Sequence, residues 1–112
     1  MNGKVRLKEK DEQPVNEFKA RLLKEFPRAE CILFGSKVNG KDSDFSDIDL
    51  LVLLETKVDV SLEKKIFDIG FEVGLRFEAV FGIVVEERKF WNSDIAKAMP
   101  FYQNIAERGV TL

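Results

Sequence analysis

The chain has 112 residues, with 18 basic and 20 acidic side chains and a formal net charge of −2. This length fits one domain with one modest core, and a 45% share of hydrophobic residues argues against a disordered chain. The charge balance argues against bulk electrostatic binding of nucleic acid or of an acidic membrane. The chain has no histidine, which excludes a histidine triad base, imidazole zinc ligands and a near-neutral acid–base switch.

Targeting and membrane signals are not found. No apolar run approaches the roughly 20 residues of a membrane helix, and the charged N-terminus lacks the apolar block of a signal peptide. The single cysteine, Cys31, cannot form an internal disulfide, so we expect it to be buried in a reducing compartment. We therefore expect a cytoplasmic protein without membrane association.

The chain begins with a charged stretch. We interpret residues 1–11 as a charged N-terminal tail and residues 12–112 as a single domain. Val5 and Leu7 alternate with basic residues, so an edge strand is the alternative for this stretch.

The first half of the domain predicts a helix followed by two strands. The helix begins near Pro14 and ends before Pro27, with apolar residues at helical spacing: Val15, Phe18, Leu22, Leu23 and Phe26. Residues 29–34 predict a short buried strand. Residues 35–46, rich in glycine, serine, asparagine and aspartate, predict a loop, and residues 47–54 a second apolar strand.

The second half predicts a helix, a strand and a short helix. Leu62, Ile66, Ile69 and Val73 form the helical stripe, with Asp59 or Ser61 as N-cap. Gly70 and Gly74 lie one turn apart in it, which indicates either close approach to the sheet or a bent, frayed helix.

Residues 79–85 predict the third strand, Pro100 opens a last helix that Gly109 ends, and residues 110–112 form a final strand. The order of elements predicts an α/β domain with one small sheet.

Two aspartates begin the second strand. Asp47 and Asp49 are two residues apart, so they project from the same face. Adjacent carboxylates repel, and a lysine, an arginine or a hard divalent cation such as Mg²⁺ or Mn²⁺ would neutralise them. The simpler interpretation is a strand that begins in solvent with two exposed carboxylates.

A glycine–serine turn follows the first strand. At Gly35 and Ser36 the backbone N–H groups and the serine hydroxyl can face an anion, and glycine lets a phosphate come close. A plain tight turn or N-cap is the alternative. Together with Asp47 and Asp49, the turn predicts a phosphate cradle that faces a metal-binding carboxylate pair.

Two similar motifs fail at required positions. Residues 35–41 match the first seven positions of a P-loop, but Asp42 stands where a serine or threonine must bind Mg²⁺. Asp42, Asp44 and Ser46 resemble the start of an EF-hand loop. Its sixth and twelfth positions would be Asp47 and Leu53 instead of glycine and glutamate.

The segment FGSKVNGKDSDFSDIDLLVLL, residues 34–54, resembles the signature of the DNA polymerase β-like nucleotidyltransferase superfamily, and within it the minimal nucleotidyltransferases. The matching positions are Gly35, Ser36, Gly40, Ser46, Asp47, Asp49 and Leu50. The order of elements and the ending from Phe101 to Gly109 are also similar to that family.

The resemblance implies an α/β (α+β) fold, a small mixed sheet flanked by helices. It also implies two Mg²⁺ (or Mn²⁺) ions and nucleotidyl transfer from ATP or another nucleoside triphosphate. Asp47 and Asp49 would be catalytic and would bind the metals. Gly35 and Ser36 would hold the β- and γ-phosphates. Lys37 and Lys41 either reach the phosphates as well or are plain solvated lysines.

The family normally has a third carboxylate on the following strand, which helps to activate the attacking hydroxyl. The matching position here falls near Gly82, which has no side chain. Glu86 has the parity of Gly82 and is our first candidate for this catalytic base, if a bulge draws it toward the aspartates. In an unbulged strand it lies ~13 Å further along. Glu86 and Glu87 alternatively open a helix.

Short members of the family are often half of a two-protein module. The resemblance therefore implies a small helical partner of the HEPN toxin type, and it leaves self-association open. The alternative is a degenerate, non-catalytic module that binds its partner as an antitoxin, which the missing carboxylate favours. A nucleic-acid-binding domain is a third interpretation. The charge balance argues against it, so strong nucleic-acid binding is not expected.

Overall fold

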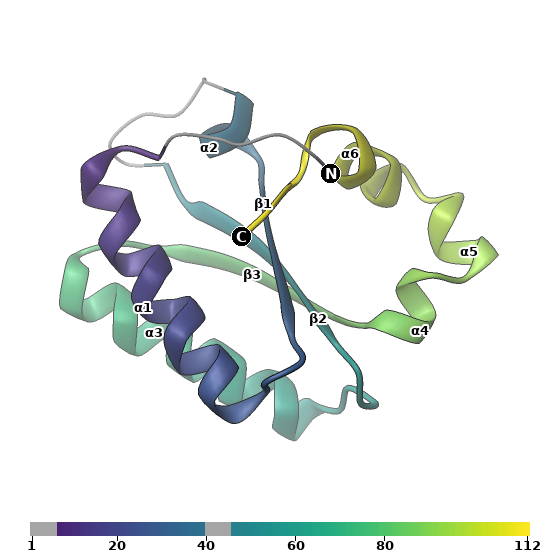
Figure 1. The fold of residues 1–112 in the computed structure, drawn as a ribbon, viewed down its shortest axis with the longest axis horizontal. Helices are drawn as coiled ribbons and strands as arrows, with labels where there is room; N and C mark the ends of the chain where they lie inside the picture. Colours follow the sequence, from purple (N-terminus) through teal and green to yellow (C-terminus); the bar gives the residue numbers. More distant parts are fainter. Residues whose placement is uncertain (1–6, 40–45) are drawn as a thin grey trace.

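Four strands form one mixed sheet in the order β3-β2-β1-β4 (Figure 1). The computed structural model describes residues 7–39 and 46–112. The elements, in chain order, are α1 (Glu9–Glu25), β1 (Glu30–Phe34), α2 (Ser36–Asn39), β2 (Ile48–Leu54), α3 (Val60–Phe77), β3 (Phe81–Glu87), α4 (Arg88–Trp91), α5 (Asp94–Lys97), α6 (Pro100–Arg108) and β4 (Val110–Thr111).

The strand pairing makes the sheet mixed. β1 pairs antiparallel with both β2 and β4, whereas β2 pairs parallel with β3. Because β2 and β3 are parallel, a crossover must join them, and α3 provides it. The small mixed sheet flanked by helices that we expected is therefore confirmed.

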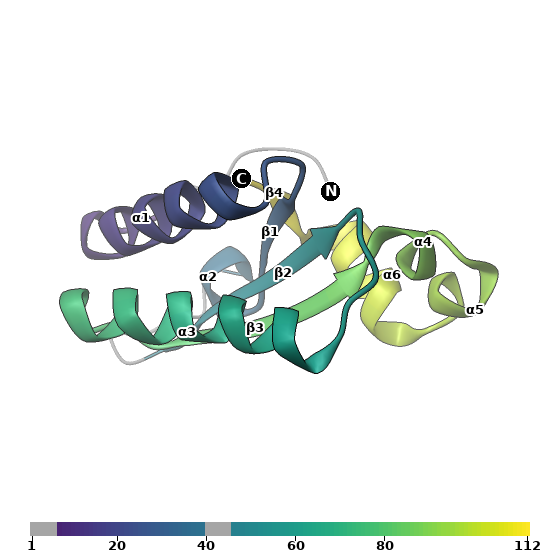
Figure 2. The same cartoon turned by 90° about the horizontal axis from the view of Figure 1, so that it is seen from below.

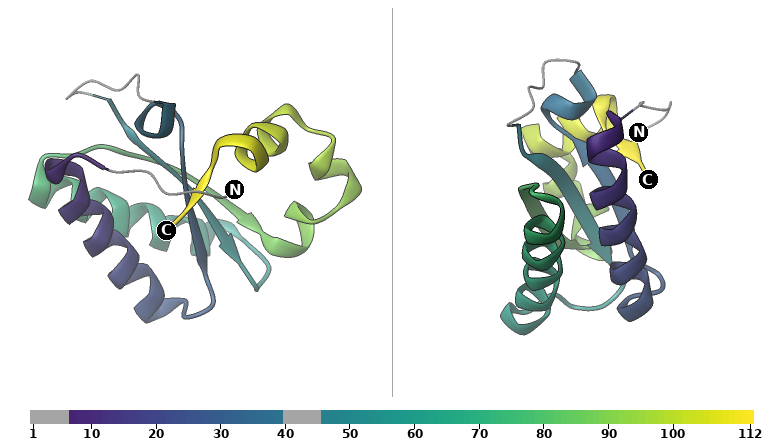
Figure 3. Two further views of the ribbon diagram at one scale, coloured as in Figure 1. Left: turned by 45° about the horizontal axis from the view of Figure 1, so that its top comes forward. Right: turned by 90° about the vertical axis from the view of Figure 1, so that its left-hand side faces the viewer.

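The two faces of the sheet pack against different helices. Along β2, Leu50, Val52 and Leu54 pack with α1 and α3, and Leu51 and Leu53 pack with Trp91 and the helix α6. Side chains alternate between the faces of a strand, which explains this division. α1 and α3 lie side by side on one face, and α4 to α6 gather beyond the far end of β3 (Figures 2 and 3).

The first helix begins earlier than its proline predicts. α1 starts at Glu9, so residues 9–11, which we assigned to the tail, are helical. Glu9, Asp11 and Glu12 lie in its first turn, where acidic side chains are favourable near the positive end of the helix dipole. Residues 1–6 lie outside the described part of the chain, and with them the alternative of an edge strand at Val5.

The two glycines of α3 mark close approaches, as one of our two interpretations predicts. A Cβ at Gly70 would lie 2.5 Å from Cδ1 of Ile83, and one at Gly74 would lie 2.5 Å from the carbonyl oxygen of Ala79. α3 therefore packs on β3 and on the turn before it more closely than any other residue would allow. Asp59 caps the helix, because its Oδ1 accepts a hydrogen bond from the Leu62 N–H at 2.8 Å.

The third strand begins and ends two residues later than the predicted range of 79–85. It runs through Glu86 and Glu87, so these two residues do not open a helix; α4 begins only at Arg88. α5 was not expected, while the last helix and the final strand are confirmed. No helix in residues 7–39 and 46–112 combines the length and apolar character needed to cross a membrane.

The cysteine is buried between β1 and the helices. Cys31 is 3% exposed, and this burial raises the pKa of its thiol to about 12. The thiol is therefore neutral and unreactive at physiological pH, as its expected burial implies.

Candidate active site

Asp49 lies near the start of β2, on the face away from α1 and α3. Its partners in the sheet are Phe34 on β1 and Gly82 on β3, so all three positions share that face. The Phe34 ring packs edge-to-face on Phe101 of α6, with ring centroids 5.3 Å apart. The carboxylate thus stands beside an aromatic cluster, in a half-buried position.

Two glycines flank the carboxylate of Asp49. A Cβ at Gly82 would lie 2.6 Å from Oδ1, and a Cβ at Gly35 would collide with Oδ2. Gly35 also has a φ of 79°, in the left-handed region that favours glycine. The carboxylate therefore occupies a space that only two residues without side chains leave open. Gly35 belongs to the turn that follows β1, and this turn lies beside the start of β2, where Asp49 is found (Figure 1).

Asp47 is exposed and precedes β2 by one residue. Burial, and in second place the charge of Asp47, raise the pKa of Asp49. The site therefore disfavours a second negative charge and favours a cation. Carboxylate oxygens in an open, glycine-lined position fit a hard divalent cation such as Mg²⁺. Among the described residues, however, no three histidine, cysteine or acidic side chains come together as a metal site.

Ser36 follows the left-handed glycine and begins α2. The Val38 N–H donates a hydrogen bond to the Gly35 carbonyl, which closes this turn at 3.1 Å. Ser36 is half-exposed and directly follows Gly35, the residue that lies against Asp49. Its predicted contact with phosphate stays a prediction.

The Lys37 side chain points toward α1 and not toward Asp47 and Asp49. Its Nζ lies 3.0 Å from Oδ2 of Asp11 on α1, and the two side chains are only 1% and 6% exposed. A lysine that is buried and paired in the fold cannot also serve as a solvated arm for phosphate. We therefore correct both of its expected roles: Lys37 holds the Gly35 turn against α1.

Sequence reasoning missed Asp11, which it placed in the tail. In the structure Asp11 shares the buried stripe of α1 with Val15, Phe18 and Leu22. Their spacing of four, three and four residues was the available signal, but residues 1–11 were assigned to the tail because the stretch is charged. Gly40, Lys41, Asp42 and Asp44 lie outside the described residues, so the expectations that concern them are not addressed.

Within one chain, the structure does not bring Glu86 to the aspartates. The register of β2 and β3 is continuous from Ile48 opposite Phe81 to Leu54 opposite Glu87, so no bulge draws the strand in. Glu86 pairs with Leu53, four positions beyond Asp49 and ~13 Å along the strand. Burial, followed by the charge of Glu63, raises the pKa of Glu86.

The register does place Gly82 directly opposite Asp49, the position at which the resemblance calls for a third carboxylate. Gly82 is therefore the true structural counterpart, and it has no side chain to offer. The apolar groove between α3 and β3 lies on the other face of the sheet and is not part of this site.

Comparison with known proteins gives a family and a fold. A model of the nucleotidyltransferase domain matches residues 15–103. No curated protein matches the sequence.

Two solved structures have a similar fold. One is a crystal structure of a toxin–antitoxin with AMP-PNP, 19% identical with a TM-score of 0.57, in which the match covers 84% of this chain and 68% of that one. The other is a mutant of the toxin–antitoxin MntA-HpeT, 19% identical with a TM-score of 0.59, covering 88% and 70%. The family model covers most of the chain, including Gly35, Asp47, Asp49 and Gly82. The chain therefore belongs to the nucleotidyltransferase domain family, and its fold is that of a minimal polymerase β-like nucleotidyltransferase.

Proposed function

We propose that this domain transfers a nucleotidyl group, AMP from ATP in the first instance, to a hydroxyl group with the help of Mg²⁺ or Mn²⁺. The observation that carries the proposal is the carboxylate of Asp49 held between Gly35 and Gly82, inside the segment that the family model matches. This arrangement leaves room for a cation on Asp49 and for a phosphate at the glycine turn.

Each residue has a separate role in this proposal. Gly35 gives the turn its left-handed conformation, and Ser36 donates its hydroxyl to the β- or γ-phosphate. Asp47 and Asp49 hold the divalent ions through their oxygens. Such ions, when bound, orient the triphosphate and neutralise the charge that develops at the α-phosphorus. Lys37 acts only indirectly, because its pairing with Asp11 positions the turn.

For the acceptor we propose a hydroxyl on a small helical protein of the HEPN toxin type. The support is that the two solved structures compared above are toxin–antitoxin proteins, one of them with an ATP analogue. A nucleotide on the partner would then mask or modify it.

The direct test is incubation of the purified chain with labelled ATP, Mg²⁺ and the protein encoded by the neighbouring gene. We expect label on that protein with the wild type and none with Asp49→Asn. Equal label from both chains would contradict the assignment of the site, and label on neither protein with any acceptor would contradict transfer.

A non-catalytic antitoxin is the second candidate. Gly82 favours it, because the position opposite Asp49 lacks the carboxylate that a catalytic site requires. In that case the chain forms a complex with its partner that neither ATP nor Mg²⁺ affects, and the Asp49→Asn chain binds the partner as tightly as the wild type. Pull-down with and without Mg²⁺–ATP separates the two candidates.

A further inference from the structure

β3 is an edge strand of the sheet, and its outer edge is apolar in the middle. It carries Ile83, Val84 and Val85 between Gly82 and Glu86. An edge strand of seven residues offers unpaired backbone groups to another chain, and monomeric proteins usually protect such an edge with proline, lysine or a bulge. Residues 81–87 contain no proline or lysine, and their register with β2 shows no bulge.

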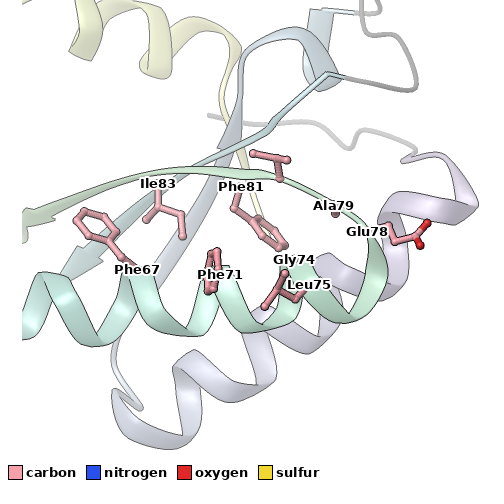
Figure 4. A pocket seen from close by; sticks show the side chains of 10 residues that line it. Phe67, Phe71, Gly74, Leu75, Glu78, Ala79, Phe81 and Ile83 are labelled. Carbon is pink, nitrogen blue, oxygen red and sulfur yellow. The ribbon is translucent and has the colours of Figure 1, made fainter.

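An apolar groove follows the same edge. It has a volume of about 640 Å³ and lies between α3 and β3, lined chiefly by Phe67, Phe71, Leu75, Phe81 and Ile83 (Figure 4). Phe71 and Leu75 are each 67% exposed. Large apolar side chains that gather at an unpaired strand mark a surface that another chain covers.

We propose that β3 pairs with β3 of a second copy of this chain, antiparallel about Val84, and that Glu86 of the second copy supplies the carboxylate that position 82 lacks. The catalytic half of this inference rests on the proposed function; the pairing itself does not.

The middle of the strand determines the register. A two-fold axis at Val84 pairs every residue of β3, which opposes Phe81 to Glu87, Gly82 to Glu86 and Ile83 to Val85. No like charges face each other, and the apolar residues meet in the centre. A shift by two residues, the smallest that keeps both α3 helices on one face, leaves part of each strand unpaired. The same axis brings the two apolar grooves to the junction.

In this register Glu86 of the second copy comes to the site of the first. Residues directly opposite on antiparallel strands have Cβ positions about 4.5–5.5 Å apart and point to the same face. That face is the one that carries Asp49. The Asp49 carboxylate lies between the Gly35 turn and Gly82, and its Oδ1 lies 2.6 Å from where a Cβ of residue 82 would be, so no side chain at position 82 separates it from the outer edge.

The strand spacing is consistent with a shared site. Asp49 and Glu86 of the second copy would be separated by two strand spacings, about 10 Å between Cα atoms, with no side chain between them. In one chain the two residues are separated by four positions along the strand as well as one strand spacing. Glu86 has no ion pair with another described residue, and burial, followed by the charge of Glu63, raises its pKa. A cation shared with Asp49 would neutralise it.

Cross-linking tests the pairing without any need for activity. Val84 would oppose itself across the axis at a Cα separation of about 5 Å, within the range of a disulfide. We expect Val84→Cys to form a covalent dimer on mild oxidation. Glu87→Cys is the matched control, because its two copies would lie about 20 Å apart. Cys31 is buried and does not interfere.

Sedimentation of the wild type shows whether the dimer forms without a cross-link, and Phe71→Lys, on the exposed groove, should weaken it. A wild type that stays monomeric at high concentration, or equal cross-linking of the two cysteine variants, would overturn the pairing.

Mixing two defective variants tests the carboxylate in trans. Asp49→Asn and Glu86→Gln should each lose one tight Mn²⁺ site per chain, measured by electron paramagnetic resonance, while Glu87→Gln keeps it. In an equal mixture, half of the dimers are mixed and each has one complete site, so about a quarter of the wild-type Mn²⁺ sites should return. Nucleotidyl transfer should return in the same proportion.

If the dimer forms but mixing restores no Mn²⁺ sites, the trans carboxylate is wrong. If the Mn²⁺ sites return although the wild type transfers no nucleotide, the trans carboxylate stands and the proposed function fails.

Discussion

The surroundings of Asp49 make ionisation of its carboxyl group less favourable. Burial and the neighbouring Asp47 raise the pKa of Asp49 above its usual value of 3.8. The folded chain therefore holds this proton more tightly than the unfolded chain. Stability from this group is present at low pH and is lost as the pH rises from about 3.8 through the folded pKa.

We expect Asp49→Asn to remove that loss in the metal-free chain. Its melting temperature should match the wild type near pH 3.5 and exceed it at pH 7, because the amide carries no charge. Adding Mg²⁺ should raise the melting temperature of the wild type and leave that of the variant unchanged. Thermal melts across this pH range check the expectation. A wild type that is the more stable of the two at pH 7 without metal would contradict it.

Lys37 supports the fold in a way that a surface lysine would not. Replacing it by methionine leaves the Asp11 carboxylate buried without its cation, which typically costs about 3–5 kcal/mol. We expect Lys37→Met to lower the free energy of unfolding by that order in urea titration. The double variant with Asp11→Leu should recover part of the loss. A single variant as stable as the wild type would mean that the pair contributes nothing.

In contrast to Lys37, Ser36 should contribute to ligand binding and not to the stability of the fold. It is half-exposed, and the turn around it depends on Gly35 and the backbone bond of Val38. We expect Ser36→Ala to keep the stability of the wild type but to weaken binding of Mg²⁺–ATP by about 1.5–3 kcal/mol, the value of a hydrogen bond to a charged group. Unchanged affinity in calorimetric titration would show that Ser36 only shapes the turn.

At the scale of elements, local patterns predicted the long segments and missed the contacts between them. The apolar stripe of α3 and the continuous run of β2 were evident, because burial of one helix face or of a whole strand leaves a periodic signal. The early start of α1 was not, because residues 9–11 are charged and Asp11 is buried against Lys37, which lies 26 positions away. α5, with four residues, is too short to leave a periodicity.

The glycines of α3 offer a matched pair of substitutions. Alanine gains about 1 kcal/mol of helix propensity over glycine at either position. At Gly70 the new methyl group meets the movable end of Ile83, whereas at Gly74 it meets the backbone oxygen of Ala79. We therefore expect Gly74→Ala to be less stable than Gly70→Ala by about 1–3 kcal/mol in chemical denaturation. Equal stabilities of the two variants would mean that the backbone at Ala79 moves away from the new methyl group without a measurable loss of stability.

At the scale of the whole molecule, the sequence predicted which residues meet at the candidate site better than it predicted how the strands around that site are arranged. Asp49 and the Gly35 turn were identified from their spacing, and the structure does place them together. The lack of a carboxylate near Gly82 was expected too. Only the register of β3 with β2 shows that Gly82 lies directly opposite Asp49, on a strand at the edge of the sheet. No pattern within one strand reveals which other strand, or which other chain, will lie beside it.

The measurement that tests the central claim most directly is calorimetric titration of ATP into the purified wild type, Asp47→Asn and Asp49→Asn chains, each with and without Mg²⁺. If the glycine turn and the two aspartates form a nucleotidyltransferase site, the wild type binds ATP in the presence of Mg²⁺ and binds it much more weakly in its absence. Both variants then lose the Mg²⁺-dependent part while their melts remain cooperative. ATP binding of wild-type strength in both variants, or no Mg²⁺-dependent binding by the wild type, would contradict the account.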